Sequence, residues 1–178
     1  MTDIRLTHAV YTFGTALFAG LLYAFEQGVI PALRGLTASE YTRMEQALIH
    51  HLDAFPTGVI AVATVSMLLP LYPLIRLRGS RDRAFWKLTF AGWLLFCFGV
   101  GVFTIVLNVP VNEYVKTWSS ASPPADWQAA RDRWNTLNHI RTPLNLVSLA
   151  CYIWASYALG EVTRQRAVAI QGAAPPAS

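Results

Sequence analysis

Four long stretches without a charged residue constrain this chain more than any other feature. They cover residues 6–25, 54–75, 88–112 and 142–160. About 20 helical residues are needed to cross the hydrocarbon core of a bilayer, and all four stretches come close to this length or exceed it. A soluble four-helix bundle would instead carry a charged stripe along every helix. The sequence therefore predicts four membrane-spanning helices.

The composition supports this prediction and indicates how the chain is organised. Hydrophobic residues make up 54% of the chain and charged residues only 13%, whereas a soluble domain carries roughly 25% charge. We therefore expect an all-α integral membrane protein: an antiparallel four-transmembrane-helix bundle whose fourth helix extends outside the membrane. This domain should cover residues 1–165. Residues 166–178, whose end is rich in alanine and proline, are expected to form a disordered tail.

The distribution of basic residues predicts the orientation in the membrane. The predicted topology places eight lysines and arginines on one side and six on the other: Arg5, Arg76, Arg78, Arg81, Arg83, Lys87, Arg164 and Arg166 against Arg34, Arg43, Lys116, Arg131, Arg133 and Arg141. The positive-inside rule then puts both termini in the cytoplasm of a multi-pass protein of the cell membrane. The net charge of +4 is explained by these flanking residues, so we expect the lipid bilayer as partner and no nucleic acid.

The connection between the first two stretches predicts a helix near the membrane surface. Thr37 and Glu40 have the spacing of a capping box, which begins a helix. The apolar residues that follow recur at helical spacing and are expected to form one face: Tyr41, Met44, Leu48 and Leu52.

Polar side chains gather at one membrane face, where the first and third stretches end and the second and fourth begin. Asn108 and Asn112 stand four residues apart, on one helix face. The fourth helix carries a polar and aromatic stripe at steps of three and four: Trp134, Asn138, Arg141, Asn145, Ser148 and Tyr152. This pattern favours a cavity lined by Arg141 and the amides. An arginine that snorkels to the lipid headgroups is the alternative.

Ionisable residues lie at the same depth or just outside it. Glu26 ends the first stretch, and an ion pair with Arg141 is the structural alternative to a functional role. His50, His51 and His139 are candidate metal ligands. However, adjacent histidines on a helix point about 100° apart, and no further ligand stands at reliable spacing. We expect no cofactor, with a metal or a haem as open alternatives.

Two motifs resemble a known membrane family. Residues 107–112 read Leu-Asn-Val-Pro-Val-Asn, and residues 133–142 read Arg-Trp-Asn-Thr-Leu-Asn-His-Ile-Arg-Thr, with Trp118 between them. Together with Gly20, Phe25 and residues 31–33 in the first helix and its exit, they resemble the family that includes the anthrone oxygenases. The resemblance covers roughly residues 6–160.

The resemblance implies an oxygenase or oxidase that acts on a lipophilic, anthrone-like aromatic molecule with dioxygen as second substrate. Oxidation can begin with loss of an acidic C–H proton, and the carbanion can reduce dioxygen without a cofactor. His139, or a histidine of the connection between the first two stretches, would be the base, and Arg141 and Asn108 would stabilise the oxyanion. The substrate-binding residues would be Asn112, Asn138, Trp134, Trp118, Glu26 and Asn145.

Other functional classes stay open on the sequence alone. A non-catalytic membrane module that binds a small molecule or a partner protein would use the same pocket. A redox membrane protein that holds haem, metal or quinone is a third class. The tryptophans Trp118 and Trp134 fit a substrate stack as well as anchors at the membrane interface. A homo-oligomer is compatible with all three classes.

Overall fold

The computed structural model describes residues 2–53, 58–79 and 83–172, and within them the chain is helical with no β-strand. The first half contains α1 (Thr2–Ala24), the π-helical segment η1 (Phe25–Val29), α2 (Ile30–Leu33), α3 (Ala38–Asp53), α4 (Gly58–Leu68) and α5 (Leu71–Arg76). The second half contains α6 (Arg83–Phe96), the π-helical segments η2 (Cys97–Val102) and η3 (Thr104–Asn108), α7 (Val109–Lys116) and α8 (Trp127–Gly172). The all-α prediction is confirmed.

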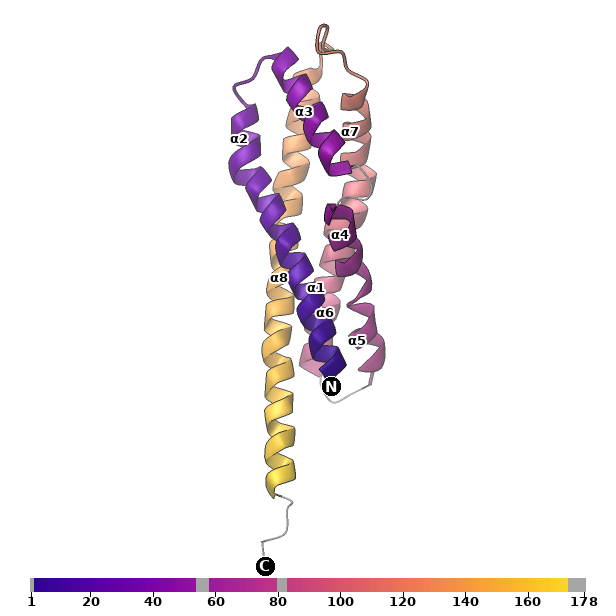
Figure 1. Cartoon of the computed structure of the whole chain (residues 1–178), viewed down its shortest axis with the longest axis vertical. Coiled ribbons are helices and arrows are strands. Elements are labelled where there is room, and N and C mark those ends of the chain that lie inside the picture. The colour runs from indigo at the N-terminus through magenta and orange to yellow at the C-terminus, as the bar shows by residue number, and fades with distance from the viewer. Residues whose placement is uncertain (1, 54–57, 80–82, 173–178) are drawn as a thin grey trace, which may run out of the picture.

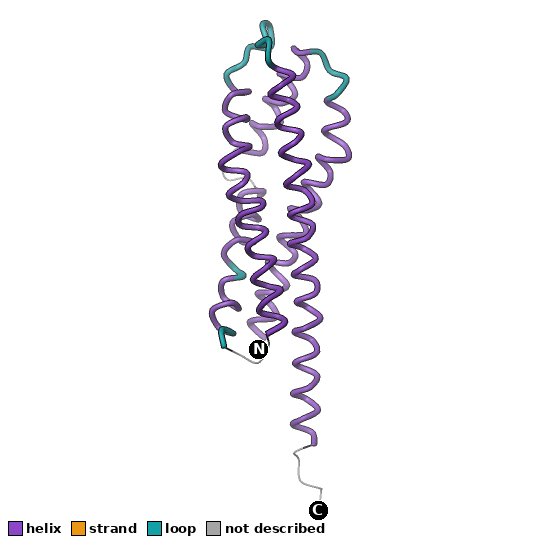
Figure 2. The backbone as a smooth tube through the Cα atoms, turned by 180° about the vertical axis from the view of Figure 1, so that it is seen from behind, coloured by secondary structure: helices purple, strands orange, loops and turns teal. Residues whose placement is uncertain are grey.

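The helices run along one common axis (Figure 1). The chain ascends through α1, returns through α3, α4 and α5, ascends again through α6 and α7, and descends through α8. The N-terminus and α5 lie at the end opposite to α3 and α7, and α8 continues past the N-terminus. The view from behind shows the same arrangement (Figure 2).

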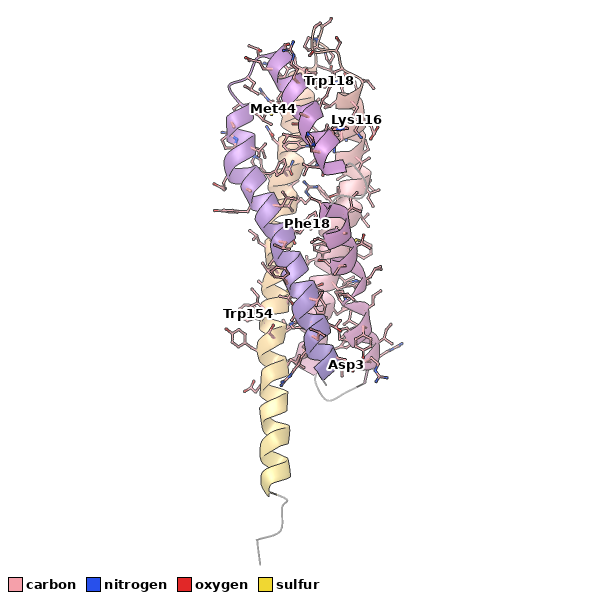
Figure 3. All side chains as sticks on the ribbon, viewed as in Figure 1. Asp3, Phe18, Met44, Lys116, Trp118 and Trp154 are labelled. Atoms are coloured by element: carbon pink, nitrogen blue, oxygen red, sulfur yellow. The ribbon has the colours of Figure 1, made fainter. Side chains whose placement is uncertain are left out.

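Three helices are long and apolar enough to cross a membrane: Asp3–Leu33, Gly58–Arg76 and Ala84–Lys116. This property by length and composition indicates a membrane protein. Residues 142–160, the fourth predicted span, lie inside α8, a continuous helix of 46 residues. Large side chains are exposed on the outside of the bundle. Trp154 projects from α8 away from the other helices, with 65% of its surface exposed (Figure 3).

The predicted boundary of the tail differs from the structure. The helix α8 reaches Gly172, so residues 166–172, which the composition placed in a disordered tail, are helical. Residues 161–171 contain neither glycine nor proline, and nothing in them ends a helix. Residues 173–178, the alanine- and proline-rich end, lie outside the described residues.

Two prolines coincide with the π-helical turns. Pro31 is the second residue of α2, directly after η1, and Pro110 is the second residue of α7, directly after η3. A proline has no backbone N–H, and its ring clashes with the carbonyl four residues earlier. A π turn wraps an additional residue and relieves this conflict locally. Asn108 is the last residue of the π-helical segment η3.

The surface helix has the predicted start but a different buried face. The backbone N–H of Thr37 donates to Oε2 of Glu40 at 2.9 Å. The N–H of Glu40 donates back to the Thr37 hydroxyl at 3.5 Å, which confirms the predicted capping box. Met44, expected on the apolar face, is 49% exposed, and Glu45 is buried in its place with 1% exposure. The buried face differs from the predicted one because α3 packs on the bundle through residues 41, 45, 49 and 52.

Close approach of α6 and α8 depends on a glycine. A Cβ atom at Gly92 would lie 2.8 Å from a ring carbon of Tyr152. The Ser148 hydroxyl donates a hydrogen bond to the Gly92 carbonyl oxygen at 2.7 Å. Small residues and hydrogen bonds of this kind hold helices together inside membranes, where lipid is as apolar as the helix faces.

We expect Gly92→Ala to destabilise the bundle by about 1–3 kcal/mol, because the added methyl group overlaps the Tyr152 ring. The measurement is thermal unfolding in detergent, followed by circular dichroism. Gly20→Ala on α1 is the matched control, since a Cβ atom there meets nothing within 4 Å. Equal melting temperatures for the two variants would contradict this account of the contact between α6 and α8.

Candidate functional site

A cavity of about 340 Å³ lies within the half of the bundle that contains α3 and α7. Residues from α1 and η1, α3, α4, the continuous helix from α6 to α7, and α8 line it. Its walls are mostly apolar, and Phe25 and Trp134 contribute aromatic rings whose centroids lie 6.0 Å apart. Its polar groups come from separate elements: Glu45, Thr64, Thr104, Asn108, Asn112 and Arg141. The cavity therefore joins an apolar interior to a few placed polar groups, which is typical of small-molecule sites.

Arg141 is held in a fixed position at this cavity. Its Nη1 donates to the Thr104 hydroxyl at 2.9 Å, and its Nη2 donates to Oδ1 of Asn138 at 2.6 Å. The Nδ2 of Asn138 in turn donates to the Trp134 carbonyl oxygen at 2.9 Å. The Nε of Arg141 is buried and finds no hydrogen-bond partner among the described residues. The guanidinium thus points into the bundle, and its Nε–H remains available as a donor to a guest in the cavity.

The two amides of the third stretch also present unused polar atoms. Asn108 is 2% exposed, and both its amide nitrogen and its amide oxygen have no hydrogen-bond partner in the described part of the chain. The amide oxygen of Asn112 is in the same situation. A buried polar atom without a partner costs about 1–3 kcal/mol, and most native proteins avoid it. These atoms face a cavity where a polar guest or water can satisfy them.

Glu45 is the ionisable group that the sequence analysis missed. It lines the cavity, is 1% exposed, and neither carboxyl oxygen has a hydrogen-bond partner among the described residues. Burial raises its pKa to about 7, because a low-dielectric environment disfavours the charged form. A signal was present: Glu45 stands four residues after Tyr41 and three before Leu48, so a carboxylate interrupts the apolar stripe of α3.

The helix that carries Glu45 is fastened to α7. Nε2 of Gln46 donates to the carbonyl oxygens of Val115 at 3.0 Å and Trp118 at 2.9 Å. These carbonyls belong to the last turn of α7 and the residues after it, where the helix itself offers no donors. Gln46, the residue after Glu45, therefore fixes α3 to the end of α7. This contact also positions the Glu45 carboxyl at the cavity.

Glu26 and His139 lie together but away from the cavity. Nδ1 of His139 is paired with Oε1 of Glu26, so the partner of Glu26 is this histidine rather than Arg141. The side chain of His139 is 46% exposed and that of Glu26 is 17% exposed. Neither residue lines the cavity. The pair connects η1 to α8 on the outer side, and the predicted base stands apart from the predicted oxyanion donors.

Three further residues that the sequence predicted at the site do not line the cavity: Asn138, Trp118 and Asn145. Asn138 is fully buried and supports Arg141, as described above, without lining the cavity. Trp118 packs against Tyr41 with 6.4 Å between ring centroids, beyond the cavity wall. Asn145 is buried farther along α8, and its amide atoms have no partner among the described residues. It does not line the cavity either.

The candidate metal ligands show no common site. His50 and His51 lie on the exposed face of α3, with ring centroids 5.3 Å apart. His139 is occupied by Glu26. Within the described ranges, no group of three or more histidine, cysteine, aspartate or glutamate residues stands close enough to hold a metal ion.

Comparison of the sequence with known protein families gives one match. The family described as anthrone oxygenase matches residues 47–151, which is more than half of the chain. The matched segment includes both asparagines, Trp134 and Arg141. No curated protein and no solved structure matches the chain. The chain belongs to the anthrone oxygenase family.

We expect Glu45→Gln to stabilise the protein in a pH-dependent manner. The folded-state pKa of about 7 lies above the unfolded value of 4.5, so the folded state binds the proton more tightly. Stability is therefore greatest below pH 4.5 and falls as the pH rises to about 7. The full penalty is about 3 kcal/mol, since one pKa unit corresponds to about 1.4 kcal/mol.

The measurement is the melting temperature in detergent at pH 4.5 and at pH 8. Glutamine keeps the shape of the side chain without its charge, so its advantage should be large at pH 8 and small at pH 4.5. Glu113→Gln provides the control, because Glu113 is an exposed residue paired with Lys116. A gain for Glu45→Gln that is equal at both pH values would contradict a buried, titrating carboxyl.

Proposed function

We propose that this member of the anthrone oxygenase family is a membrane-embedded oxygenase that oxidises a lipophilic aromatic molecule with dioxygen. The observation that carries the proposal is the position of the Arg141 guanidinium. It is held by Thr104 and Asn138 at the edge of a mostly apolar cavity. Such a site favours a flat apolar body with one polar oxygen.

The dimensions and walls of the cavity support an aromatic substrate of modest size. Its volume of about 340 Å³ is at the lower end of the range of about 300–1,000 Å³ for small-molecule pockets. Phe25 and Trp134 offer ring faces and edges for stacking. A lipophilic substrate dissolved in the bilayer would find the same apolar surroundings in the pocket.

The proposed chemistry converts an anthrone-like methylene group to a carbonyl group. Loss of a C–H proton leaves an anion whose charge is delocalised onto the carbonyl oxygen of the substrate. The anion then reduces dioxygen: one oxygen atom enters the product, and the other leaves as water. Arg141, Asn108 and Asn112 would donate to the developing oxyanion. Fixed donors in a water-excluded site are worth far more than in water, because they need no reorganisation.

The proposal extends to topology. We propose that residues 142–160 of α8 form a fourth span, with both termini in the cytoplasm of a multi-pass protein of the cell membrane. Large side chains on the outside of this part of α8 support lipid contact, since Trp154 is 65% and Tyr157 is 73% exposed. The basic residues between α5 and α6 support the orientation.

Cysteine labelling tests the topology. In a chain with Cys97→Ala and Cys151→Ala, single cysteines are placed by Ala84→Cys, Ala121→Cys and Ser178→Cys. We expect a membrane-impermeant maleimide to label the Ala121→Cys protein on intact cells. The other two proteins should react only after permeabilisation. Labelling of the Ser178→Cys protein but not of the Ala84→Cys protein from outside would contradict the fourth span, and labelling of both from outside would reverse the orientation.

Substitution of Arg141 tests the reaction. We expect Arg141→Lys to lower turnover by about 10²–10³, the typical loss when one preorganised donor is removed. Lysine keeps the charge but lacks the planar fork that holds Thr104 and Asn138 while offering a further donor. The measurement is oxygen uptake with anthrone as substrate, next to the melting temperature in detergent. Arg133→Lys, at an exposed position of the same helix, is the control and should behave as the unmodified chain.

The results separate catalysis from a structural role. Activity that falls only as far as the folded fraction would leave Arg141 as a structural tie between α8 and η3. Quenching of tryptophan fluorescence by an added anthraquinone, without any oxygen uptake by the unmodified chain, would favour a non-catalytic binding module instead.

A further inference from the structure

The Glu45 carboxyl has no structural role that would explain its position. It forms no hydrogen bond and no ion pair with the described residues, and it is 1% exposed. A buried charge without a partner is costly, and the group ordinarily avoids the charge by keeping its proton. A hydrophobic residue at this position of α3 would pack against the same neighbours without the cost. The carboxyl lies instead on the wall of the cavity, in contact with the volume where a guest would be held.

We infer that Glu45 is the proton acceptor that removes the C–H proton of the bound aromatic substrate. This inference rests on the proposed function and adds to it the residue that starts the reaction. The polar groups of the cavity then divide into two sets on different helices. Glu45 comes from α3, and the donors Arg141, Asn108 and Asn112 come from α8 and the third span.

The separation of the Glu45 carboxyl from the donors Arg141, Asn108 and Asn112 suits the reaction. A base must take a proton from carbon while donors stabilise the negative charge that moves to oxygen. A base close enough to Arg141 for an ion pair would be neutralised by it and would lose its affinity for protons. No hydrogen bond or ion pair connects Glu45 to Arg141 in the described structure. The two groups share a cavity, and the substrate can lie between them.

The ionisable surroundings of Glu45 leave its proton affinity high. Burial alone raises its pKa to about 7, which is the range in which a carboxylate is an effective base near neutral pH. Arg141 is the other charged residue on the cavity wall. Tyr41, one turn earlier on α3, stays protonated, because burial and then the nearby Glu45 raise its pKa. Arg131 and Asp132 of α8 act on Tyr41 with opposite signs.

The cycle balances with this one carboxyl group. The Glu45 carboxylate takes the first methylene proton, and the substrate anion adds to dioxygen to give a peroxide anion on carbon. Glu45 returns its proton to the peroxide. It then takes the second proton from the same carbon while the O–O bond breaks, the carbonyl forms and hydroxide leaves. Transfer of that proton to hydroxide gives water and restores the carboxylate. The methylene carbon is oxidised, and dioxygen is reduced.

Glu45 replaces His139 in the role that the sequence pattern assigned to a histidine. His139 is paired with Glu26 and does not line the cavity, so it would need to leave this partner to reach a guest there. Glu45 needs no movement. A kinetic comparison of the two residues therefore decides between an internal and an external base.

The experiment measures oxygen uptake with anthrone across pH 5.5–9 for the unmodified chain and three variants: Glu45→Gln, His139→Gln and the control Glu113→Gln. The rate in protein-free micelles is subtracted at each pH. We expect kcat/KM of the unmodified chain to fall as the pH is lowered through about 7, because the base becomes protonated. Glu45→Gln should lower kcat by about 10²–10⁴ and abolish this acidic limb, and Glu113→Gln should change neither.

Binding and isotope measurements distinguish loss of the base from loss of the site. The affinity for anthraquinone, measured by quenching of tryptophan fluorescence, should change by no more than a few-fold in Glu45→Gln. Deuterium at the reacting carbon should lower the turnover of this variant more than that of the unmodified chain. An acidic limb that persists in Glu45→Gln, or that disappears in His139→Gln instead, would overturn the inference while the proposed function stands. An unmodified chain without oxygen uptake above the protein-free rate would overturn the proposed function, and the inference with it.

Discussion

The cost of burying polar groups in an apolar bundle governs this structure. Along most of the helices the cost is avoided, because the backbone bonds within each helix and the side chains are apolar. Some buried polar side chains are tied to a partner, as Ser148 is to the Gly92 carbonyl oxygen. Others keep buried atoms without a partner among the described residues, and Asn145 and Tyr152 do so away from the cavity. On the cavity wall, Glu45, Asn108 and Arg141 come from three different elements and each keeps such an atom, and this convergence supports the proposal that the cavity holds a guest.

Local helix irregularities bring these groups together. The third span departs from α-helical geometry through η2 and η3 before Pro110 begins the next regular turns. Thr104 and Asn108 belong to η3, and one anchors Arg141 while the other faces the cavity. A π turn rotates the following residues relative to those before it, so a span can be lipid-facing along its length and still present polar groups inward near its end.

The short helix α3 completes the site, although it is not one of the apolar spans. Its capping box fixes its start, and Gln46 fixes it to the carbonyl end of α7. The chain thereby returns a carboxylate to the interior at a point where the spans provide amides, hydroxyls and the Arg141 guanidinium. The separation of a base on α3 from the donors on α8 and η3 is the arrangement on which the proposed chemistry depends, since an ion pair between them would neutralise both.

The sequence by itself determined the helical class, the three long apolar helices, the capping box and the polar stripe of α8, because helix periodicity and apolar length are local properties of the chain. It also identified the family, and Asn108, Asn112, Trp134 and Arg141, which it placed at one membrane face, line one cavity in the structure. Only the tertiary structure decided which faces are buried. It turned Glu45 inward and Met44 outward, and it paired Glu26 with His139 outside the cavity. The burial of a side chain depends on what packs against its helix face, and residues far apart in the sequence supply those neighbours.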